Sequence, residues 1–294
     1  MNVAILSRHE DIYSTRRLVE SCRKAGHEAR AMDPFLFLLH SGEGHADLDY
    51  EGEPVTGIDA IVPRIGASTN ASGIAVLRQF EERGVYSLNG SDAILRCRDK
   101  FRCIQLLSGK GIPVPPTSLT LRQDDVRRAI AEVGGPPVIL KVLEGAQGKG
   151  VFLAESEIEA EEKVEALHQD RRYVLIQKFI SECRGRDLRA FVVGEEVVAA
   201  IRRSAEGEEF RSNVHLGGNA VPTEVTPEVG RLALGAARTL GLEVAGVDFL
   251  EPERGPLVLE VNASPGLEGI ETVSGTDIAG RIVTLLEREM GVST

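Results

Sequence analysis

The side chains best suited to chemistry flank a turn near the C-terminal end of the chain. Residues 246–250 and 256–262 are mostly apolar runs on either side of 251–255, which predicts an antiparallel hairpin centred on Arg254. In that register Asp248 lies opposite Glu260, with Asn262 on the same face. Facing carboxylates repel unless a cation separates them, and carboxylate and amide oxygens are ligands that Mg²⁺ takes together with phosphates. The hairpin therefore predicts a divalent-cation site, and a solvated hairpin face is the alternative.

A glycine-rich segment, residues 144–150, lies between two strand-like runs. Small residues let backbone N–H groups close around an anion such as phosphate. The segment is not a Walker A loop, because no Gly-Lys-Ser/Thr follows. A phosphate-binding loop that uses Gly145, Gly148 and Gly150 and a plain flexible hairpin loop are both compatible with this pattern.

Two lysines are candidate phosphate ligands. Lys141 lies inside the apolar run 138–143, where an ammonium group without an anionic partner is costly. A phosphate held by the adjacent loop is a suitable partner, and an edge-strand lysine that faces water is the alternative. Lys100 is a second candidate, although taken alone it resembles a surface lysine.

A cluster of arginines interrupts this acidic chain at residues 184–211. Arginine holds carboxylates and phosphates in a two-pronged fork. A solvated basic edge is the alternative, which we favour for Arg184 and Arg203 taken individually. Ser212 and Asn213 follow Arg211 with further polar groups. The cluster comprises Arg184, Arg186, Arg189, Arg202, Arg203 and Arg211.

The first ninety residues alternate between strand-like and helix-like segments, which predicts a parallel sheet. Ser14 is expected to cap one helix, and Ser91 is expected to cap another that continues towards Ser108. A dinucleotide fingerprint is lacking after the first strand, which disfavours a dehydrogenase. The predicted strands are 3–6, 58–62 and 85–88, and the predicted helices are 14–25 and 74–83.

We place a domain boundary near residue 93, ahead of the proline-rich connector 111–116. The remaining chain mixes strands with a few helices. The expected strands are 117–121, 138–143, 151–154, 173–180, 188–193, 197–201, 244–250 and 257–261. The expected helices are 124–133, 157–168, 227–240 and 277–289.

Composition narrows the class of protein. The 294 residues carry a formal charge of −11 with 42% hydrophobic residues, typical of a folded globular chain and unfavourable for general nucleic-acid binding. A membrane-spanning run is absent from the sequence, as is a signal peptide. The four cysteines include no Cys-x-x-Cys pair, so we expect reduced thiols and a cytoplasmic protein, and the histidines show no zinc-ligand spacing.

The order of these motifs resembles that of ATP-grasp carboxylate–amine ligases. Longer strings resemble the RimK family of α-L-glutamate ligases, which add glutamates to the C-terminus of a small-subunit ribosomal protein. The similarity covers essentially the whole chain, and its most specific string is 262–271. The other strings are 4–8, 63–66, 77–81, 98–100 and 210–213.

The resemblance implies an α/β fold, with a Rossmann-like parallel-sheet pre-ATP-grasp domain at 1–93. A central ATP-grasp subdomain would occupy 94–180 and a C-terminal subdomain 181–294. It further implies ATP, two Mg²⁺ or Mn²⁺ ions and a homo-oligomer such as a tetramer. Position 178 departs from relatives, which usually carry Glu there, and His215-Leu216-Gly217-Gly218 has Leu where relatives often have Arg. These two departures bear on nucleotide and acceptor choice.

The resemblance also implies roles for individual residues. The metal ions would be held by Asp248, Glu260 and Asn262. Lys100 and Lys141 would bind the ATP phosphates, residues 177–180 would line the adenine site, and Asp187 would meet the ribose. Arg211 and Asn213 would lie at the phosphate and substrate end. The full set of nucleotide-binding residues would be Lys100, Lys141, the glycines of the 144–150 loop, Gln177, Lys178, Phe179, Ile180, Asp187, Arg189, Arg211, Ser212 and Asn213. The catalytic residues would be Arg202, Arg211 and Asn213.

The expected activity is ATP-dependent ligation of L-glutamate to the C-terminal glutamate of a ribosomal small-subunit protein through an acyl-phosphate, with poly-α-glutamate as a further product. A ligase of the same family could act instead on a carrier protein, a coenzyme tail or an N-acyl amino acid. A nucleotide-binding regulator without catalysis is the alternative from another class. The intact metal-ligand and lysine positions argue against that regulator.

Overall fold

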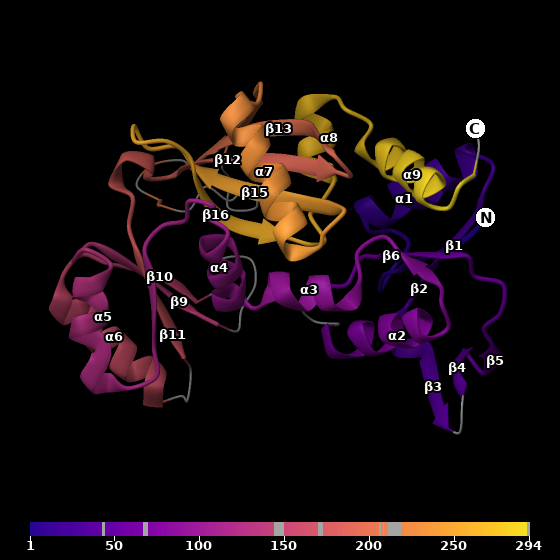
Figure 1. Ribbon diagram of the computed structural model, residues 1–294, viewed down its shortest axis with the longest axis horizontal. Coiled ribbons are helices and arrows are strands. Elements are labelled where there is room, and N and C mark those ends of the chain that lie inside the picture. The colour runs from indigo at the N-terminus through magenta and orange to yellow at the C-terminus, as the bar shows by residue number, and fades with distance from the viewer. Residues whose placement is uncertain are drawn as a thin grey trace.

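The structure is a computed structural model that describes residues 1–42, 45–66, 70–143, 150–169, 173–205, 207, 209–210 and 219–292. It confirms the mixed α/β class, with a parallel N-terminal sheet and antiparallel sheets beyond it. In Figure 1 the N-terminal elements lie at the right, the sheet that carries β9 to β11 at the lower left, and the sheet that carries β12 to β16 above and between them.

The parallel sheet has the strand order β2-β1-β6-β7. Helix α1 starts at Tyr13, one residue before the expected start, and its N-cap is Ile12 rather than Ser14. The hydroxyl of Ser14 instead accepts a hydrogen bond from Leu267 N at 2.9 Å. A small antiparallel sheet, β3-β4-β5, was not predicted. The bounds are β1 (Asn2–Leu6), α1 (Tyr13–Lys24), β2 (Glu28–Met32), β3 (Phe37–Gly42), β4 (His45–Tyr50), β5 (Glu53–Pro54), β6 (Ala60–Pro63), α2 (Asn70–Glu82) and β7 (Tyr86–Ser87).

The single helix predicted after residue 90 is two helices, α3 (Ser91–Arg98) and α4 (Lys100–Gly109). The break occurs at Asp99, whose carboxylate accepts a hydrogen bond from Arg102 N at 2.9 Å and so caps α4. Ser91 is not the cap of α3, because Gly90 holds that position. Glu81 instead accepts hydrogen bonds from the backbone N and the hydroxyl of Ser91. The break makes Lys100 the first residue of α4.

The next sheet is antiparallel with the order β10-β9-β11-β8, and it packs against helices α5 and α6. Strand β9 is therefore an interior strand, which rules out the edge-strand alternative for Lys141. The bounds are β8 (Thr117–Thr120), α5 (Val126–Glu132), β9 (Val138–Val142), β10 (Val151–Ala154), α6 (Glu157–Gln169) and β11 (Val174–Lys178).

The largest sheet has the order β14-β13-β12-β15-β16, and α7 covers one of its faces. Buried side chains of α3 and α4 share one hydrophobic core with this face of the sheet. Helix α3 contacts β16 and α7, and α4 packs against α7. The bounds are β12 (Arg186–Val193), β13 (Glu196–Ser204), β14 (Asn219–Pro222), α7 (Pro227–Leu240), β15 (Val244–Leu250), β16 (Leu257–Asn262), α8 (Glu268–Ser274) and α9 (Ile278–Glu289).

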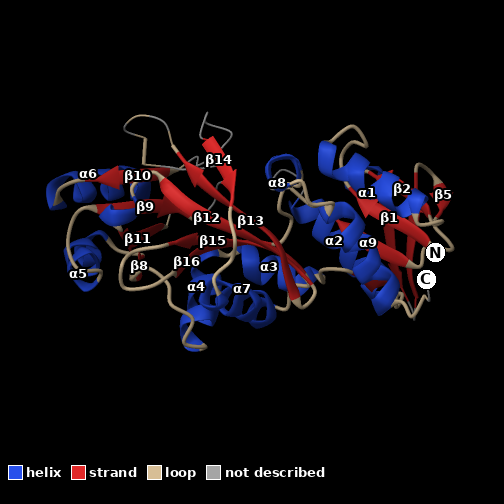
Figure 2. Ribbon diagram, turned by 90° about the horizontal axis from the view of Figure 1, so that it is seen from above, coloured by secondary structure: helices blue, strands red, loops and turns tan. Residues whose placement is uncertain are grey.

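The C-terminal helix α9 returns to the N-terminal sheet and packs against α1, as both views show (Figures 1 and 2). Its buried residues share a core with the first strand, so the two ends of the chain stabilise one body. The thiols of Cys22, Cys97, Cys103 and Cys183 are free and buried, as expected for reduced cysteines. Within the described residues, no helix is long and apolar enough to cross a membrane.

Candidate active site

Asp248 and Glu260 are direct partners in the β15–β16 hairpin, which confirms the predicted register at this point. The same pairing places Asn262 opposite Gly246, and the register shifts by one residue just beyond Asp248, towards the turn. Phe249, the next residue along β15, is fully buried on the other face. The two carboxylates and the carboxamide therefore share one face of the sheet.

Asp248 on β15 is held by two arginines, Arg189 from the adjacent strand β12 and Arg203 from β13, one strand further away. Arg189 Nε and Nη2 donate to its two carboxylate oxygens at 2.6 and 2.7 Å, and Arg203 Nη2 donates at 3.0 Å. Arg203 also forms a bidentate pair with Asp187 at 2.6 and 2.5 Å. Burial alone would raise the pKa of Asp248, but the two guanidinium groups outweigh it and lower the pKa to about 2. Asp248 is therefore ionised at neutral pH.

The expectation that Arg203 lies on a solvated edge is wrong, because its side chain is only 5% exposed. Its burial follows from the strand pairing, in which Arg203 opposes Asp187 and Arg189 opposes Asp248. Successive residues of a strand face opposite sides of a sheet, so Arg202 lies on the other face from this cluster. There Arg202 is exposed and pairs with Glu251 at 3.0 Å, and its assignment as catalytic stays a prediction.

Arg184 is exposed, as expected. Arg203 is a buried residue of the candidate site that the sequence pattern did not predict. A regular hairpin with its turn at Gly194-Glu195 would pair Arg203 with Arg186. The register shift between Phe191 and Val192 brings Arg203 opposite Asp187 instead, and no local pattern indicates that shift.

Glu260 lies in a different environment from Asp248. It is solvent-accessible, and no hydrogen bond or ion pair to its carboxylate is seen among the residues that the structure describes. Desolvation by the surrounding elements, followed by the charge of Asp248, raises its pKa, while Lys141, Arg189 and Lys100 oppose the rise. An acidic group of this kind is suited to bind a cation that enters from solvent.

The two candidate lysines come from separate elements and both act on Glu260. Lys141 lies on β9, and Lys100 Nζ donates to the carbonyl of Leu143 at 2.9 Å, just beyond the end of that strand. Burial lowers the pKa of both lysines, and the negative charge of Glu260 opposes this shift in each of them. The positive charge of Lys100 lowers the pKa of Lys141 further. Two partly desolvated cations beside a carboxylate form a site that favours an added polyanion such as a triphosphate.

The predicted adenine segment is the end of β11 and the residues after it. Gln177 is buried, and its amide donates to Thr117 Oγ1 at 2.9 Å. Lys178 N donates to the carbonyl of Pro116 at 2.9 Å, and Phe179 is partly buried ahead of buried Ile180. These contacts fix the backbone of the segment. Its part in nucleotide binding stays a prediction.

Several predicted residues lie outside the described residues, and their assignments stay predictions. Gly150 is described, with φ of +84°, and a Cβ there would come within 2.3 Å of Val142 Cγ2, so only glycine fits. Asp187 is described and buried with its carboxylate on Arg203, and contact with a ribose stays a prediction. The residues outside the description are Gly145, Gly148, Arg211, Ser212, Asn213, His215 and Leu216.

The residues of the hairpin fit a hard divalent cation. Asn262 lies on the same face, where its carboxamide oxygen is the atom suited to bind a cation, and no partner for its buried amide nitrogen is seen among the described residues. Asp248 accepts three hydrogen bonds, and a carboxylate offers about four acceptor sites, which leaves room for one more contact. Glu260 is accessible. Such a set of oxygens suits Mg²⁺ or Mn²⁺.

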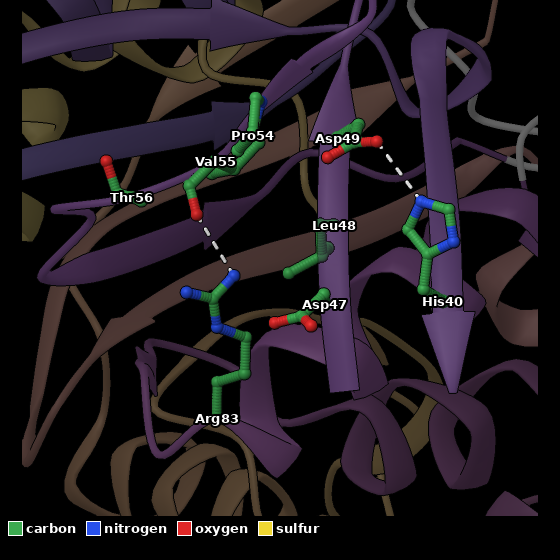
Figure 3. A pocket seen from close by; sticks show the side chains of 8 residues that line it. All are labelled: His40, Asp47, Leu48, Asp49, Pro54, Val55, Thr56 and Arg83. Carbon is green, nitrogen blue, oxygen red and sulfur yellow. Dashed lines mark hydrogen bonds and ion pairs between the residues drawn. The ribbon is translucent and has the colours of Figure 1, made fainter. Parts of the chain in front are cut away.

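A hollow of about 440 Å³ lies elsewhere, against β4 and β5 (Figure 3). His40 Nε2 pairs there with Asp49 at 3.1 Å, and Arg83 donates to the carbonyl of Val55 at 3.0 Å. These charged groups are paired within the protein. The hollow contains none of the predicted site residues.

Comparison with known proteins agrees with this geometry. Residues 97–286 match the RimK-like ATP-grasp domain and residues 1–94 match the RimK PreATP-grasp domain. A "Probable alpha-L-glutamate ligase" of Cellvibrio japonicus is 52% identical over 98% of this chain and 95% of its own length. A protein of the same name from Thioalkalivibrio sulfidiphilus is 50% identical over 98% of this chain and 96% of its own length.

The ATP-grasp ligase PsnB, solved with a phosphomimetic variant of a minimal precursor, Mg and ADP, superposes with a TM-score of 0.74. It is 25% identical, over 98% of this chain and 97% of its own. The RimK domain protein of Sphaerobacter thermophilus has the same fold, with a TM-score of 0.74 and 24% identity over 97% and 99% of the two chains. The chain belongs to the RimK family of ATP-grasp proteins. It is an ATP-dependent ligase.

Proposed function

We propose that the chain is an α-L-glutamate ligase that joins L-glutamate to the C-terminal glutamate of a small-subunit ribosomal protein. The observation that carries the proposal is that Lys100 and Lys141 lie near enough to Glu260, opposite Asp248, for their charges to act on its carboxylate. Such a site binds a nucleoside triphosphate with its metal ions. The names of the close relatives supply the amino acid.

The first step activates the acceptor. A carboxylate oxygen of the acceptor attacks the γ-phosphorus of ATP, and the bond to the β,γ-bridging oxygen breaks to give an acyl-phosphate and ADP. Lys100 and Lys141 neutralise charge on the phosphoryl oxygens during this transfer. Bound at Asp248, Glu260 and Asn262, two Mg²⁺ or Mn²⁺ ions would supply further charge neutralisation.

The second step forms the amide. The amine of glutamate attacks the acyl carbon, phosphate leaves with the C–O electron pair, and the nitrogen loses a proton. Arg189 and Arg203 keep Asp248 ionised and fixed in both steps. Water must be kept from the acyl-phosphate during this step, because it would otherwise hydrolyse the intermediate.

The acceptor is proposed to be a peptide terminus. PsnB, a structural neighbour, was solved with precursor peptides, which shows this fold binding a peptide in a related ligase. A protein with a net charge of −11 must attract an anionic C-terminus through a local positive field, and the lysines and arginines of the site supply one. We propose that the reaction takes place in the cytoplasm, where ribosomal proteins and reduced thiols occur together.

Intact-mass spectrometry tests the proposal. A peptide that ends in glutamate is incubated with the protein, ATP, Mg²⁺ and L-glutamate, with a peptide amidated at its C-terminus as control. A ladder spaced by one glutamyl residue on the free-acid peptide alone supports the proposal. Glutamate-dependent ADP release without a ladder would show another acceptor, and absence of both would favour a nucleotide-binding regulator.

A further inference from the structure

The carboxyl ends of β1 and β6 form a second candidate binding region. These strands are adjacent in the parallel sheet, whose order is β2-β1-β6-β7. Strand β1 therefore has β2 as its neighbour on one side and β6 on the other. Ligands of open α/β sheets bind in the crevice at such a point, where the strand order reverses. Arg64 is the first residue after β6, so it lies at this carboxyl end of the sheet.

Arg64 is a partly buried cation for which the described residues supply no carboxylate partner. Its Nη2 donates to the carbonyl of Pro265 at 2.8 Å and reaches that of Ser264 at 3.5 Å. Within the described part of the chain it forms no ion pair with any Asp or Glu. Burial lowers its pKa to about 10, and no neighbouring charge opposes this shift. Holding such a cation is costly unless an anion joins it.

The chain segment that Arg64 holds leads directly from the metal site. Ser264 and Pro265 follow Asn262 by two and three residues. The segment is fixed over the strand ends, because Ser264 Oγ donates to the carbonyl of Pro63 at 3.4 Å and Leu267 N donates to Ser14 Oγ. Arg64 therefore borders the predicted reaction site from the side of the parallel sheet.

We infer that Arg64 binds the non-reacting carboxylate of a glutamyl substrate and so selects glutamate over glutamine. The inference rests on the proposed ligase function. The reacting carboxylate must reach the γ-phosphate beside Lys100 and Lys141, and an arginine fork on that group would weaken it as a nucleophile. The side-chain carboxylate of a glutamyl group has the charge and shape that the fork recognises. It can come from the acceptor's terminal residue or from the incoming glutamate.

Steady-state kinetics with matched substrates tests the inference. Arg64→Gln is compared with wild type on acceptor peptides ending in Glu or Gln, and with free glutamate or glutamine as the amine. We expect KM to rise roughly 30-fold or more for one glutamyl substrate, with its preference over the amide largely lost. The KM for ATP should stay near the wild-type value. The substrate whose preference collapses identifies the source of the carboxylate.

Two further variants make the result decisive. Arg78→Gln removes an exposed arginine of the same domain, which pairs with Asp92, and it should behave as wild type. Arg64→Lys keeps the charge without the fork, so it should give an intermediate KM, and it replaces Arg64→Gln if that variant does not fold. Unchanged KM and unchanged preference for both substrates in the Arg64 variants would overturn the inference. Absence of glutamate-dependent turnover in the wild type would instead overturn the ligase proposal, and the Arg64 role with it.

Discussion

Asp248 and Glu260 face each other across two antiparallel strands, yet their charges are stabilised in opposite ways. Two arginines hold the pKa of Asp248 at about 2, against the effect of burial. Desolvation and the neighbouring Asp248 raise the pKa of Glu260. The protein thus pairs a carboxylate held in two ion pairs with one for which no ion pair is seen among the described residues. The carboxylate without an ion pair is the one open to solvent.

Replacing either carboxylate by its amide should therefore have opposite consequences for stability. Asp248→Asn removes the carboxylate that Arg189 holds and one of the two carboxylates on Arg203, and it should lower the free energy of unfolding by about 3–5 kcal/mol. Glu260→Gln removes an unfavourable charge and should leave the free energy of unfolding unchanged or raise it. Urea denaturation of the ligand-free proteins measures both. Equal losses in the two variants would contradict the assignment of the arginines to Asp248.

The contribution of Asp248 should also depend on pH in a defined window. Its pKa is lower in the folded protein, at about 2, than the value of about 3.9 expected when unfolded. The ion pairs therefore stabilise the protein fully above about pH 4, and this contribution is lost as the pH falls towards 2. Urea denaturation between pH 3 and 6 should show a difference between wild type and Asp248→Asn that is constant above about pH 4 and shrinks below it. A difference that grows on acidification would contradict the pairing.

Lys141 should contribute to nucleotide affinity. Lys141→Met should weaken ATP binding about 10-fold or more, because a charged hydrogen-bond donor to phosphate is lost. Burial lowers the pKa of this lysine, so wild-type affinity should begin to fall at a pH below the ordinary lysine value as the ammonium deprotonates. Titration calorimetry at several pH values measures this, with Lys110→Met as an exposed-lysine control. An unchanged affinity in Lys141→Met would remove this lysine from the site.

Two arginines of the cluster, Arg211 and Arg184, should differ in their effect on catalysis, and Arg211 lies outside the described residues. Arg211→Ala should reduce kcat far more than Arg184→Ala, because Arg211 is assigned to the phosphate and substrate end whereas Arg184 is exposed. Steady-state ADP release measures both variants under the same conditions. Similar losses in the two would show that the pocket has been misplaced.

Local pattern was sufficient to predict the hairpin, whereas it left open whether Lys141 lies on an interior strand or an edge strand. Strand alternation and a turn at 251–255 fix which side chains face each other, and these are short-range relationships. The helix break at Asp99 was missed because Ser91-to-Ser108 reads as one amphipathic run. The cap that divides it depends on the Asp99 carboxylate turning to Arg102 N.

Long-range contacts were beyond the sequence pattern. Ser14 was predicted to cap a helix, but its hydroxyl accepts a hydrogen bond from the backbone N of Leu267, which is distant in the chain. Arg203 looked like a surface residue because arginines usually are. Its burial depends on Asp187 and Asp248 lying on two neighbouring strands, and the order of those strands in the sheet is set by tertiary packing.

The most direct test of the proposed ligase is glutamate-dependent release of ADP by the wild type, by Glu260→Gln and by Glu253→Gln. Glu253 lies exposed in the turn of the same hairpin and provides the matched control. We expect ADP release by the wild type and by Glu253→Gln that requires Mg²⁺, glutamate and an acceptor peptide, and a loss of at least about 100-fold in Glu260→Gln. Wild-type rates in folded Glu260→Gln would contradict the proposed active site.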